Sequence, residues 1–482
     1  MKKLLYLALA AMAIGPAQAK VSLPSFFASN MVMQQQTDVN LWGKATPKST
    51  VTVSPSWDGK KYTATAAADS TWRVSMPTPE AGGPYTISIT DKDSKLELEN
   101  VLLGEVWFCA GQSNMEMPMR GFDRQPLQGG NDVIAKAKSS TPVRMFIADS
   151  KDGRWVRQFS KQPKDDLQGE WLTNEPVNVA ETSATAYYFA RYIQDVLDVP
   201  VGIMIVSLGG SMIEPWISRE ELSKFSNVDF SILDNDEPIK VQQTTPCILY
   251  NAKVNPIIGY TIRGMLWYQG ESNRDNAEIY DDLMASMVKD YRSRWGQGDF
   301  PFYFVEIAPF NYEGPDKFSG ALLREAQMRA TKKIPNCGMI STLDGGHPVF
   351  IHPVDKATVG QRLAWLALGD TYGQKGFGYK SPEYDSMEIA EGKIYINVKN
   401  AARGLCPMWT SLEGFEIAGQ DGEYHPAFAE IETKTCRLAV SSPDVPEPKN
   451  VRYAFKNMTT ASVYNVHGLP LHPFRTDNQP LK

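Results

Sequence analysis

A series of short, nearly continuous apolar segments, separated by stretches of helical periodicity, constrains the fold of this chain more than any other feature. These segments are residues 101–110, 143–148, 201–208, 260–268, 302–308 and 338–343. Such runs are typical of parallel strands whose two faces are both covered. Between them, apolar residues recur at helical spacing at residues 183–197, 278–295 and 321–332. The alternation predicts a three-layer α/β/α domain with a parallel sheet over residues 101–380.

The segments on either side of this domain have a different pattern. Residues 20–100 contain short runs rich in Val, Thr, Tyr and Trp, separated by turn formers such as Asp58-Gly59. A similar pattern returns over residues 381–482. We therefore expect an N-terminal and a C-terminal β-sandwich-like domain flanking the α/β domain.

Residues 1–19 have the features of a secretory signal peptide. Lys2 and Lys3 precede an apolar run, and Ala17-Gln18-Ala19 is a small-x-small cleavage site. We expect cleavage near Ala19 and a secreted or periplasmic protein. No later stretch reaches the roughly 20 apolar residues that span a bilayer, so we expect no membrane insertion. The net charge of −6 favours neither a nucleic-acid partner nor an anionic membrane surface.

The five cysteines are widely spaced and odd in number, which indicates neither a zinc site nor a disulfide framework. An oxidising compartment would allow one bridge, and Cys406 with Cys436 is the pair to test first.

Ser113 is the candidate nucleophile. It directly follows the apolar run 101–110, and a serine at the tip of a central strand exposes its hydroxyl beside backbone N–H groups. Met115 stands where the Gly-x-Ser-x-Gly elbow of α/β-hydrolases has its second glycine. A serine here could also simply be the N-cap of the next helix.

A serine nucleophile needs a base, and two of the five histidines are well placed. His347 and His352 lie in the loop after residues 338–343, at the edge of the sheet where open α/β folds bind ligands. Asp355, just after His352, is expected to cap the following helix. Two further loops follow buried strands: one contains Gly209-Gly210, and the other runs from Gln269 to Asn273.

Several motifs in combination resemble those of sialate O-acetylesterases, which belong to the SGNH (GDSL-type) hydrolases. They are Gly104-Glu105-Val106-Trp107, Gly111-Gln112-Ser113-Asn114-Met115, residues 211–216, Leu249-Tyr250-Asn251, residues 267–273 and Ile351-His352-Pro353. The match extends over essentially the whole mature chain. The resemblance implies an SGNH-type hydrolase domain at residues 101–380 and a serine esterase that needs no cofactor and no metal.

The resemblance also implies roles for individual residues. Ser113 would attack the acetyl carbonyl, and His352 would take its proton. The oxyanion would be held by the backbone N–H of Ser113, the N–H of Gly210 and the side-chain amide of Gln269, with Asn273 as the alternative amide.

The chain departs from the SGNH pattern at the third member of the triad. SGNH enzymes usually carry an acid two or three residues before the histidine, where this chain has Phe350 and Val349. Asp344 and, as an alternative, Glu271 are the candidate acids. A backbone carbonyl could also orient the imidazole, because that role needs only a well-placed acceptor.

The function predicted on this basis is removal of O-acetyl groups from sialic acid. The alternatives are the deacetylation of xylan or another glycan by the same machinery, and a carbohydrate-binding protein with a degenerate hydrolase centre. A carboxylated sugar would favour a basic partner, for which Arg120, Arg124 and Arg263 are candidates. The sequence leaves the oligomeric state open.

Overall fold

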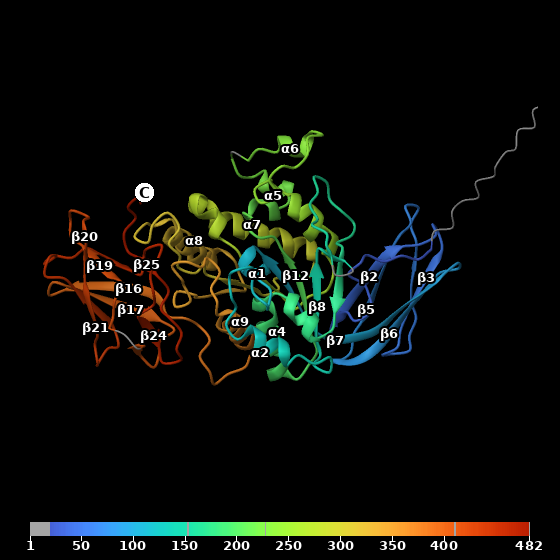
Figure 1. Ribbon diagram of the computed structural model, residues 1–482, viewed down its shortest axis with the longest axis horizontal. Helices are drawn as coiled ribbons and strands as arrows, with labels where there is room; N and C mark the ends of the chain where they lie inside the picture. Colours follow the sequence, from blue (N-terminus) through green and yellow to red (C-terminus); the bar gives the residue numbers. More distant parts are fainter. Residues whose placement is uncertain (1–19, 152–153, 227, 409–410, 482) are drawn as a thin grey trace, which may run out of the picture.

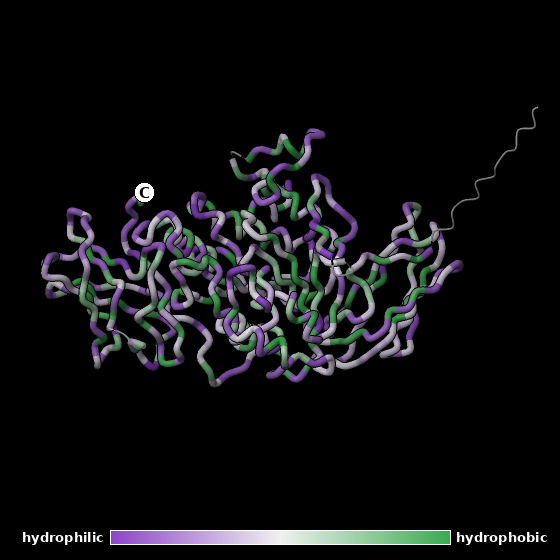
Figure 2. Tube along the Cα trace, in the orientation of Figure 1, coloured by the Kyte–Doolittle hydropathy of each residue, from purple (hydrophilic) through white to green (hydrophobic). Residues whose placement is uncertain are grey.

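The computed structural model describes residues 20–151, 154–226, 228–408 and 411–481, so the predicted signal peptide lies outside the described residues. Three parts follow one another along the long axis of the molecule (Figure 1). N-terminal strands in blue lie at one end, strands and helices occupy the centre, and C-terminal strands in orange and red lie at the other end. Hydrophobic segments concentrate along the central strands, and many outer loops are hydrophilic (Figure 2).

The central part contains the predicted parallel sheet. Its strand order is β11-β8-β12-β7-β13-β14-β15, and only the edge strand β11 runs antiparallel to its neighbour. The strands are β7 (Lys95–Gly111), β8 (Val143–Ala148), β11 (Gly169–Leu172), β12 (Val201–Ser207), β13 (Gly264–Tyr268), β14 (Phe302–Val305) and β15 (Cys337–Ile340). The α/β fold class is therefore confirmed.

Helices cover both faces of this sheet. The long ones are α4 (Ala184–Leu197), α7 (Ala277–Trp295), α8 (Ser319–Lys333) and α9 (Lys356–Asp370). Side chains of β7 alternate between the faces: Trp107 packs in the core with α4 and α9, and Phe108 in the core with α7 and α8. Each face of the sheet is thus buried by its own helix pair, which gives the predicted three layers.

Strand β7 is unusually long, at 17 residues, and belongs to two regions at once. Its first half pairs with β6 (Gly82–Thr90) antiparallel and with β1 (Val32–Gln34) parallel. Its second half pairs with β12 and β13 in the central sheet. The predicted division between residues 100 and 101 therefore falls inside one strand.

The other N-terminal strands extend from this junction. β3 (Thr50–Pro55) pairs with β6 and with β4 (Tyr62–Thr65), so these strands join the same hydrogen-bonded sheet as the central ones. β2 (Asp38–Lys44) and β5 (Thr71–Pro77) form a separate antiparallel pair.

The C-terminal part is built from antiparallel sheets around a common core, as predicted. One sheet contains β16 (Glu383–Ala390), β17 (Lys393–Lys399), β21 (Phe428–Ile431) and β22 (Leu438–Ser441), and another contains β19 (Phe415–Ala418), β20 (Tyr424–Pro426), β23 (Asn450–Tyr453) and β25 (Phe474–Arg475). A short pair, β18 (Leu405–Pro407) and β24 (Val463–Asn465), adjoins them. Ile396 of one sheet and Ile417 of the other pack in the same core.

Two further expectations concern cysteines and membranes. Cys406 and Cys436 are free thiols, so the bridge that an oxidising compartment would have allowed is not formed. None of the helices in the described ranges is long and apolar enough to cross a bilayer.

Candidate active site

Ser113 lies at the point where β7 gives way to the short helix α1 (Ser113–Glu116). The turn requires Gly111, whose φ is +147° and whose Cβ, if present, would lie 2.1 Å from the carbonyl oxygen of Tyr268. The N-cap residue of α1 is Gln112, so Ser113 does not cap the helix. Its hydroxyl is free to make a different contact.

That contact is with His352. Ser113 Oγ lies 2.8 Å from His352 Nε2, within hydrogen-bond reach for proton transfer. His347, the other candidate base, has a local role instead: its Nδ1 accepts the backbone N–H groups of Val349 and Phe350, both at 3.0 Å. Asp355 caps α9 as predicted, since its Oδ1 accepts the N–H of Thr358 at 3.0 Å.

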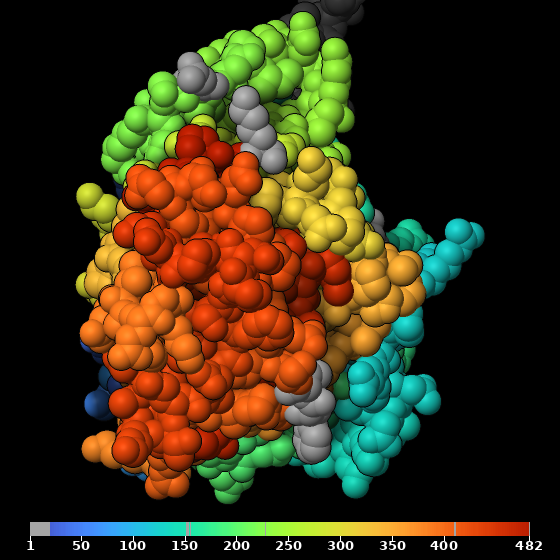
Figure 3. Space-filling model, turned by 90° about the vertical axis from the view of Figure 1, so that its left-hand side faces the viewer, coloured from blue at the N-terminus to red at the C-terminus, as the bar shows by residue number. Residues whose placement is uncertain are grey.

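The other ring nitrogen of His352 meets a residue that the sequence analysis missed. His352 Nδ1 lies 2.5 Å from the Oε1 atom of Gln125, and the edge of Phe122 packs on the imidazole with ring centroids 5.1 Å apart. In a view from the C-terminal end (Figure 3), the cyan segment around residues 120–130 and the gold-orange segment around residues 320–350 lie on the same side of the molecule. An oxygen acceptor at Nδ1 holds the proton there, which leaves Nε2 free to accept from Ser113.

Neither candidate acid contacts His352 in the structure. The two oxygens of Asp344 accept from the guanidinium of Arg362 at 2.7 and 2.6 Å. Glu271 accepts a hydrogen bond from the amide of Asn114. The predicted orienting role of Asp344 or Glu271 is therefore not supported by a contact with His352. Each carboxylate accepts from another donor, and Gln125 is the acceptor at His352 Nδ1.

The electrostatic surroundings of His352 are unusual for a catalytic histidine. Burial, and then the charge of Lys356, lower the pKa of His352 to about 4. The acceptor at Nδ1 is an uncharged amide, which orients the ring without balancing a positive imidazolium. His352 is therefore neutral, and able to act as a base, well below pH 7.

Two of the three predicted oxyanion donors have a free N–H in or beside the turn that carries the nucleophile. The Gly209-Gly210 turn packs on Ser113, since a Cβ atom at Gly209 would lie 3.5 Å from Ser113 Cβ. The N–H of Gly209 is taken by Glu116 Oε2 at 2.6 Å. The N–H groups of Ser113 and Gly210 have no acceptor within the described ranges, and Gly210 adopts φ +72°. Both are free to bind an oxyanion.

Gln269 is differently engaged. Its amide is fully buried and donates to the carbonyl of Ser211 at 3.0 Å and to Asn273 Oδ1 at 2.8 Å, so both of its protons are used. Asn273, the alternative amide, donates to Glu214 Oε2 at 3.0 Å. Through these hydrogen bonds, the two amides connect the loop after β12 to the loop after β13. In this arrangement neither side-chain amide has both of its N–H groups available to an oxyanion beside Ser113.

Within the part of the chain that the structure describes, no group of three or more His, Cys, Asp or Glu side chains could hold a metal ion. The arrangement of nucleophile, base, orienting acceptor and two backbone donors is the set needed for acyl transfer through a serine ester.

A family model described as "Carbohydrate esterase, sialic acid-specific acetylesterase" matches residues 103–368. The chain belongs to this carbohydrate esterase family. It is 27% identical over 436 residues to the sialate O-acetylesterase of Mus musculus, covering 78% of each chain. It is also 27% identical over 403 residues to that of Homo sapiens, covering 78% of this chain and 75% of the human one.

A solved structure of a carbohydrate acetylesterase from Xanthomonas citri is similar to nearly the whole chain. The TM-score is 0.85 at 32% sequence identity, covering 95% of this chain and 100% of that one. The resemblance inferred from the motifs is confirmed, and this member of the carbohydrate esterase family is a carboxylic ester hydrolase.

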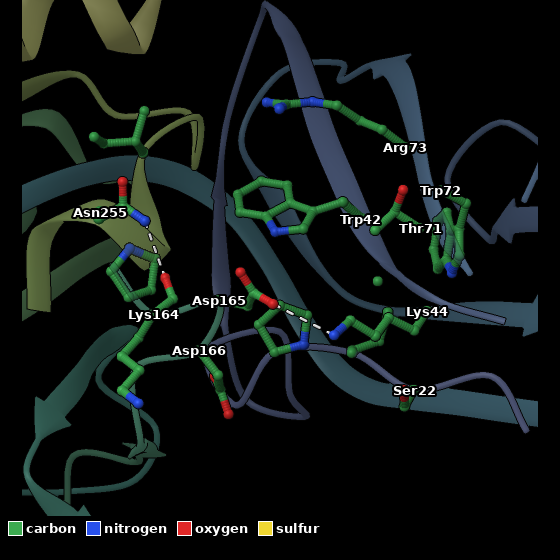
Figure 4. A pocket seen from close by; sticks show the side chains of 15 residues that line it. Ser22, Trp42, Lys44, Thr71, Trp72, Arg73, Lys164, Asp165, Asp166 and Asn255 are labelled. Atoms are coloured by element: carbon green, nitrogen blue, oxygen red, sulfur yellow. Dashed lines mark hydrogen bonds and ion pairs between the residues drawn. The ribbon is translucent and has the colours of Figure 1, made fainter. Parts of the chain in front are cut away.

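A cleft of about 380 Å³ lies between the N-terminal strands and the central part (Figure 4). Some of its aromatic and charged side chains already have partners. Arg73 lies over the ring of Trp42, 4.9 Å from its centroid, and Lys44 pairs with Asp165 at 3.3 Å. None of the predicted site residues lines this cleft.

Proposed function

We propose that this chain is a serine esterase that removes O-acetyl groups from sialic acid through an acyl-enzyme. The observation that carries the proposal is the 2.8 Å contact between Ser113 Oγ and His352 Nε2 beside two free backbone N–H groups. The named relatives, two sialate O-acetylesterases and a carbohydrate acetylesterase, support an acetylated sugar as the substrate.

The reaction has two steps. Ser113 Oγ attacks the acetyl carbonyl carbon while His352 Nε2 takes the hydroxyl proton, and the N–H groups of Ser113 and Gly210 stabilise the oxyanion. Collapse breaks the ester C–O bond, and His352 returns the proton to the departing sugar oxygen. Water then attacks the acetyl-serine with His352 again as the base, and acetate leaves.

The carboxylate of sialic acid requires a cation near this site, and one of the three candidate arginines is free to provide it. Arg120 donates to Glu181 at 2.7 Å, and Arg263 is paired with the buried Glu105 at 2.6 Å. Arg124 is exposed, precedes Gln125 in the loop that contacts His352, and has no ion pair among the described residues. We assign the sugar carboxylate to Arg124.

Acetate release from 9-O-acetylated sialic acid, measured beside acetylated xylan, tests the substrate. The proposal expects release from the sialic acid ester, with release abolished in Ser113→Ala. Preferential release from xylan would assign the same machinery to the alternative substrate. Equal release by Ser113→Ala would refute the serine mechanism.

We also propose that the enzyme is secreted or periplasmic. The support is the pattern of residues 1–19, with Lys2 and Lys3 before an apolar run and a cleavage site at Ala19. The mass of the protein recovered from the exporting cell tests this proposal: a mature chain that begins at Lys20 is expected, and an intact N-terminus on active protein inside the cell would contradict it.

A further inference from the structure

Lys356 is a buried cation directly behind the catalytic pair. It begins α9, four positions after His352, and its side chain is fully buried. Its Nζ donates to Asn114 Oδ1, and the Nδ2 of Asn114 donates in turn to Glu271 Oε1. Asn114 and Glu271 are themselves only 1% and 4% exposed. An amide thus bridges a buried cation and a buried carboxylate.

These three residues connect the three loops that build the site. Asn114 follows the nucleophile Ser113, Lys356 lies in the segment of the base His352, and Glu271 lies in the loop after β13. Asn114 also donates to the carbonyl of Ile351, the neighbour of His352, at 3.4 Å. A buried charge is strongly unfavourable unless hydrogen-bonding partners compensate it. The burial of Lys356 therefore favours the arrangement in which Asn114 keeps its hydrogen bond to Nζ.

The charge that acts on His352 is positive, whereas a usual triad places a negative carboxylate beside its histidine. The groups that contact the imidazole are Ser113, Phe122 and Gln125, none of which is charged. The charge that acts on it is that of Lys356. Lys356 in turn is faced by Asn114, Glu271, Asp355 and the ring of Tyr268, whose centroid is 5.2 Å from Nζ.

We propose that Lys356 is a positioning residue of the esterase: it fixes Asn114 beside the nucleophile, and its positive charge adds to the effect of burial in keeping His352 unprotonated in mildly acidic solution. The inference rests on the proposed serine–histidine function. Burial lowers the pKa of Lys356 to about 7, although Glu271 and Asp355 oppose this shift, so the ammonium is charged where the imidazole would otherwise gain its proton. Burial and this charge together lower the pKa of His352 to about 4.

The direct test is the pH dependence of kcat/KM on p-nitrophenyl acetate, a neutral ester, for wild type and Lys356→Met. The limb on which activity falls with acid should move to higher pH by about one unit, since a like charge near the imidazole is lost. Since the pKa of His352 is about 4 in the wild type, activity at pH 4 should fall about fivefold more than activity at pH 8.

Lys253→Met is the matched control. Lys253 is also buried, and its Nζ bonds Asp149 at 2.5 Å and the carbonyl of Ser207 at 3.0 Å, whereas the charge that acts on His352 is that of Lys356. It should lower stability without moving the acid limb. An unmoved limb in Lys356→Met, or the same shift in both variants, would overturn the proposal.

A second measurement covers the case in which Lys356→Met does not fold. The Hε1 proton of His352 can be titrated by NMR in wild-type protein, with His352→Gln used for assignment. A midpoint below about 5.5 is expected, and a midpoint above that, toward the ordinary value of about 6.5, would refute the electrostatic role. This titration needs no turnover, so it separates the present proposal from a failure of the esterase function.

Discussion

Replacing Gln125 by alanine removes the oxygen that receives the Nδ1 proton of His352 at 2.5 Å. The side chain is an uncharged amide, so its loss removes one hydrogen bond, worth about 1–3 kcal/mol, and no ion pair. A tenfold change in rate corresponds to about 1.4 kcal/mol, so kcat should fall by about 5- to 150-fold. Loss of the correct orienting carboxylate in a complete triad costs about 10⁴.

The assay is the hydrolysis of p-nitrophenyl acetate at pH 8, where His352 is neutral in both proteins. Gln128→Ala is the matched control, because Gln128 is an exposed glutamine in the same loop whose backbone N–H, retained in the variant, bonds the carbonyl of Val354. It should leave kcat within about twofold. A Gln125→Ala enzyme as fast as wild type would show that the contact does not orient the base, and a loss of 10⁴ would show that the site has a charged orienter after all.

The reverse change is equally informative. Gln125→Glu keeps the shape and places a carboxylate on Nδ1, which completes a triad of the usual charge. An opposite charge at this distance should raise the pKa of His352 by about 1–3 units, so the acid limb of the activity profile moves to higher pH. If the limb does not move, residue 125 does not contact the imidazole in solution.

Three further outcomes are expected. Asp344→Asn should leave kcat nearly unchanged, but lower the free energy of unfolding in urea by about 1–3 kcal/mol, because it breaks the ion pair with a buried arginine; a large loss of kcat would restore Asp344 as the orienter. Arg124→Ala should raise KM for 9-O-acetylated sialic acid about tenfold and leave KM for p-nitrophenyl acetate unchanged, whereas Arg120→Ala should change neither. Burial alone would raise the pKa of the Asp477 carboxyl, but hydrogen bonds from Arg452 and Tyr424 outweigh burial and lower this pKa to about 2. Its stabilisation is therefore complete above the ordinary carboxyl range and is lost as pH falls through about 2, so Asp477→Asn should lower Tm at pH 7 more than near pH 2.

The long helices were predictable because their signal is local. Apolar spacing placed helices at residues 183–197, 278–295 and 321–332, and the structure has α4, α7 and α8 within two residues of these bounds. The strands were found by their apolar runs but not by their lengths. β7 begins at Lys95, in a stretch of alternating charge and leucine that is exposed on one side, so the apolar run marks only its buried half.

The site was predictable only where the residue type limits the choice. A chain with five histidines offers few bases; position along the sheet leaves His347 and His352, and the resemblance to the esterase family selects His352. Gln125 carried no such signal. It lies 227 positions from His352, and a single sequence does not show which of its loop amides will contact the histidine. Asp344 was a reasonable acid by position, but Arg362 on α9 lies opposite it and takes both carboxylate oxygens.

The length of strand β7 limits where the chain of this esterase can be truncated, fused to another domain or recombined with a relative. Its 17 residues span about 55 Å when extended, with the blue N-terminal strands paired along one end and Ser113 just beyond the other (Figure 1). Because β7 is continuous across both regions, no hinge separates them. The N-terminal strands cannot move or detach from the central sheet without breaking the hydrogen bonds of the strand that leads to the nucleophile. Chains truncated to begin at residue 101 would lose the paired first part of β7 along with the N-terminal strands, and they should be inactive even though every catalytic group is retained.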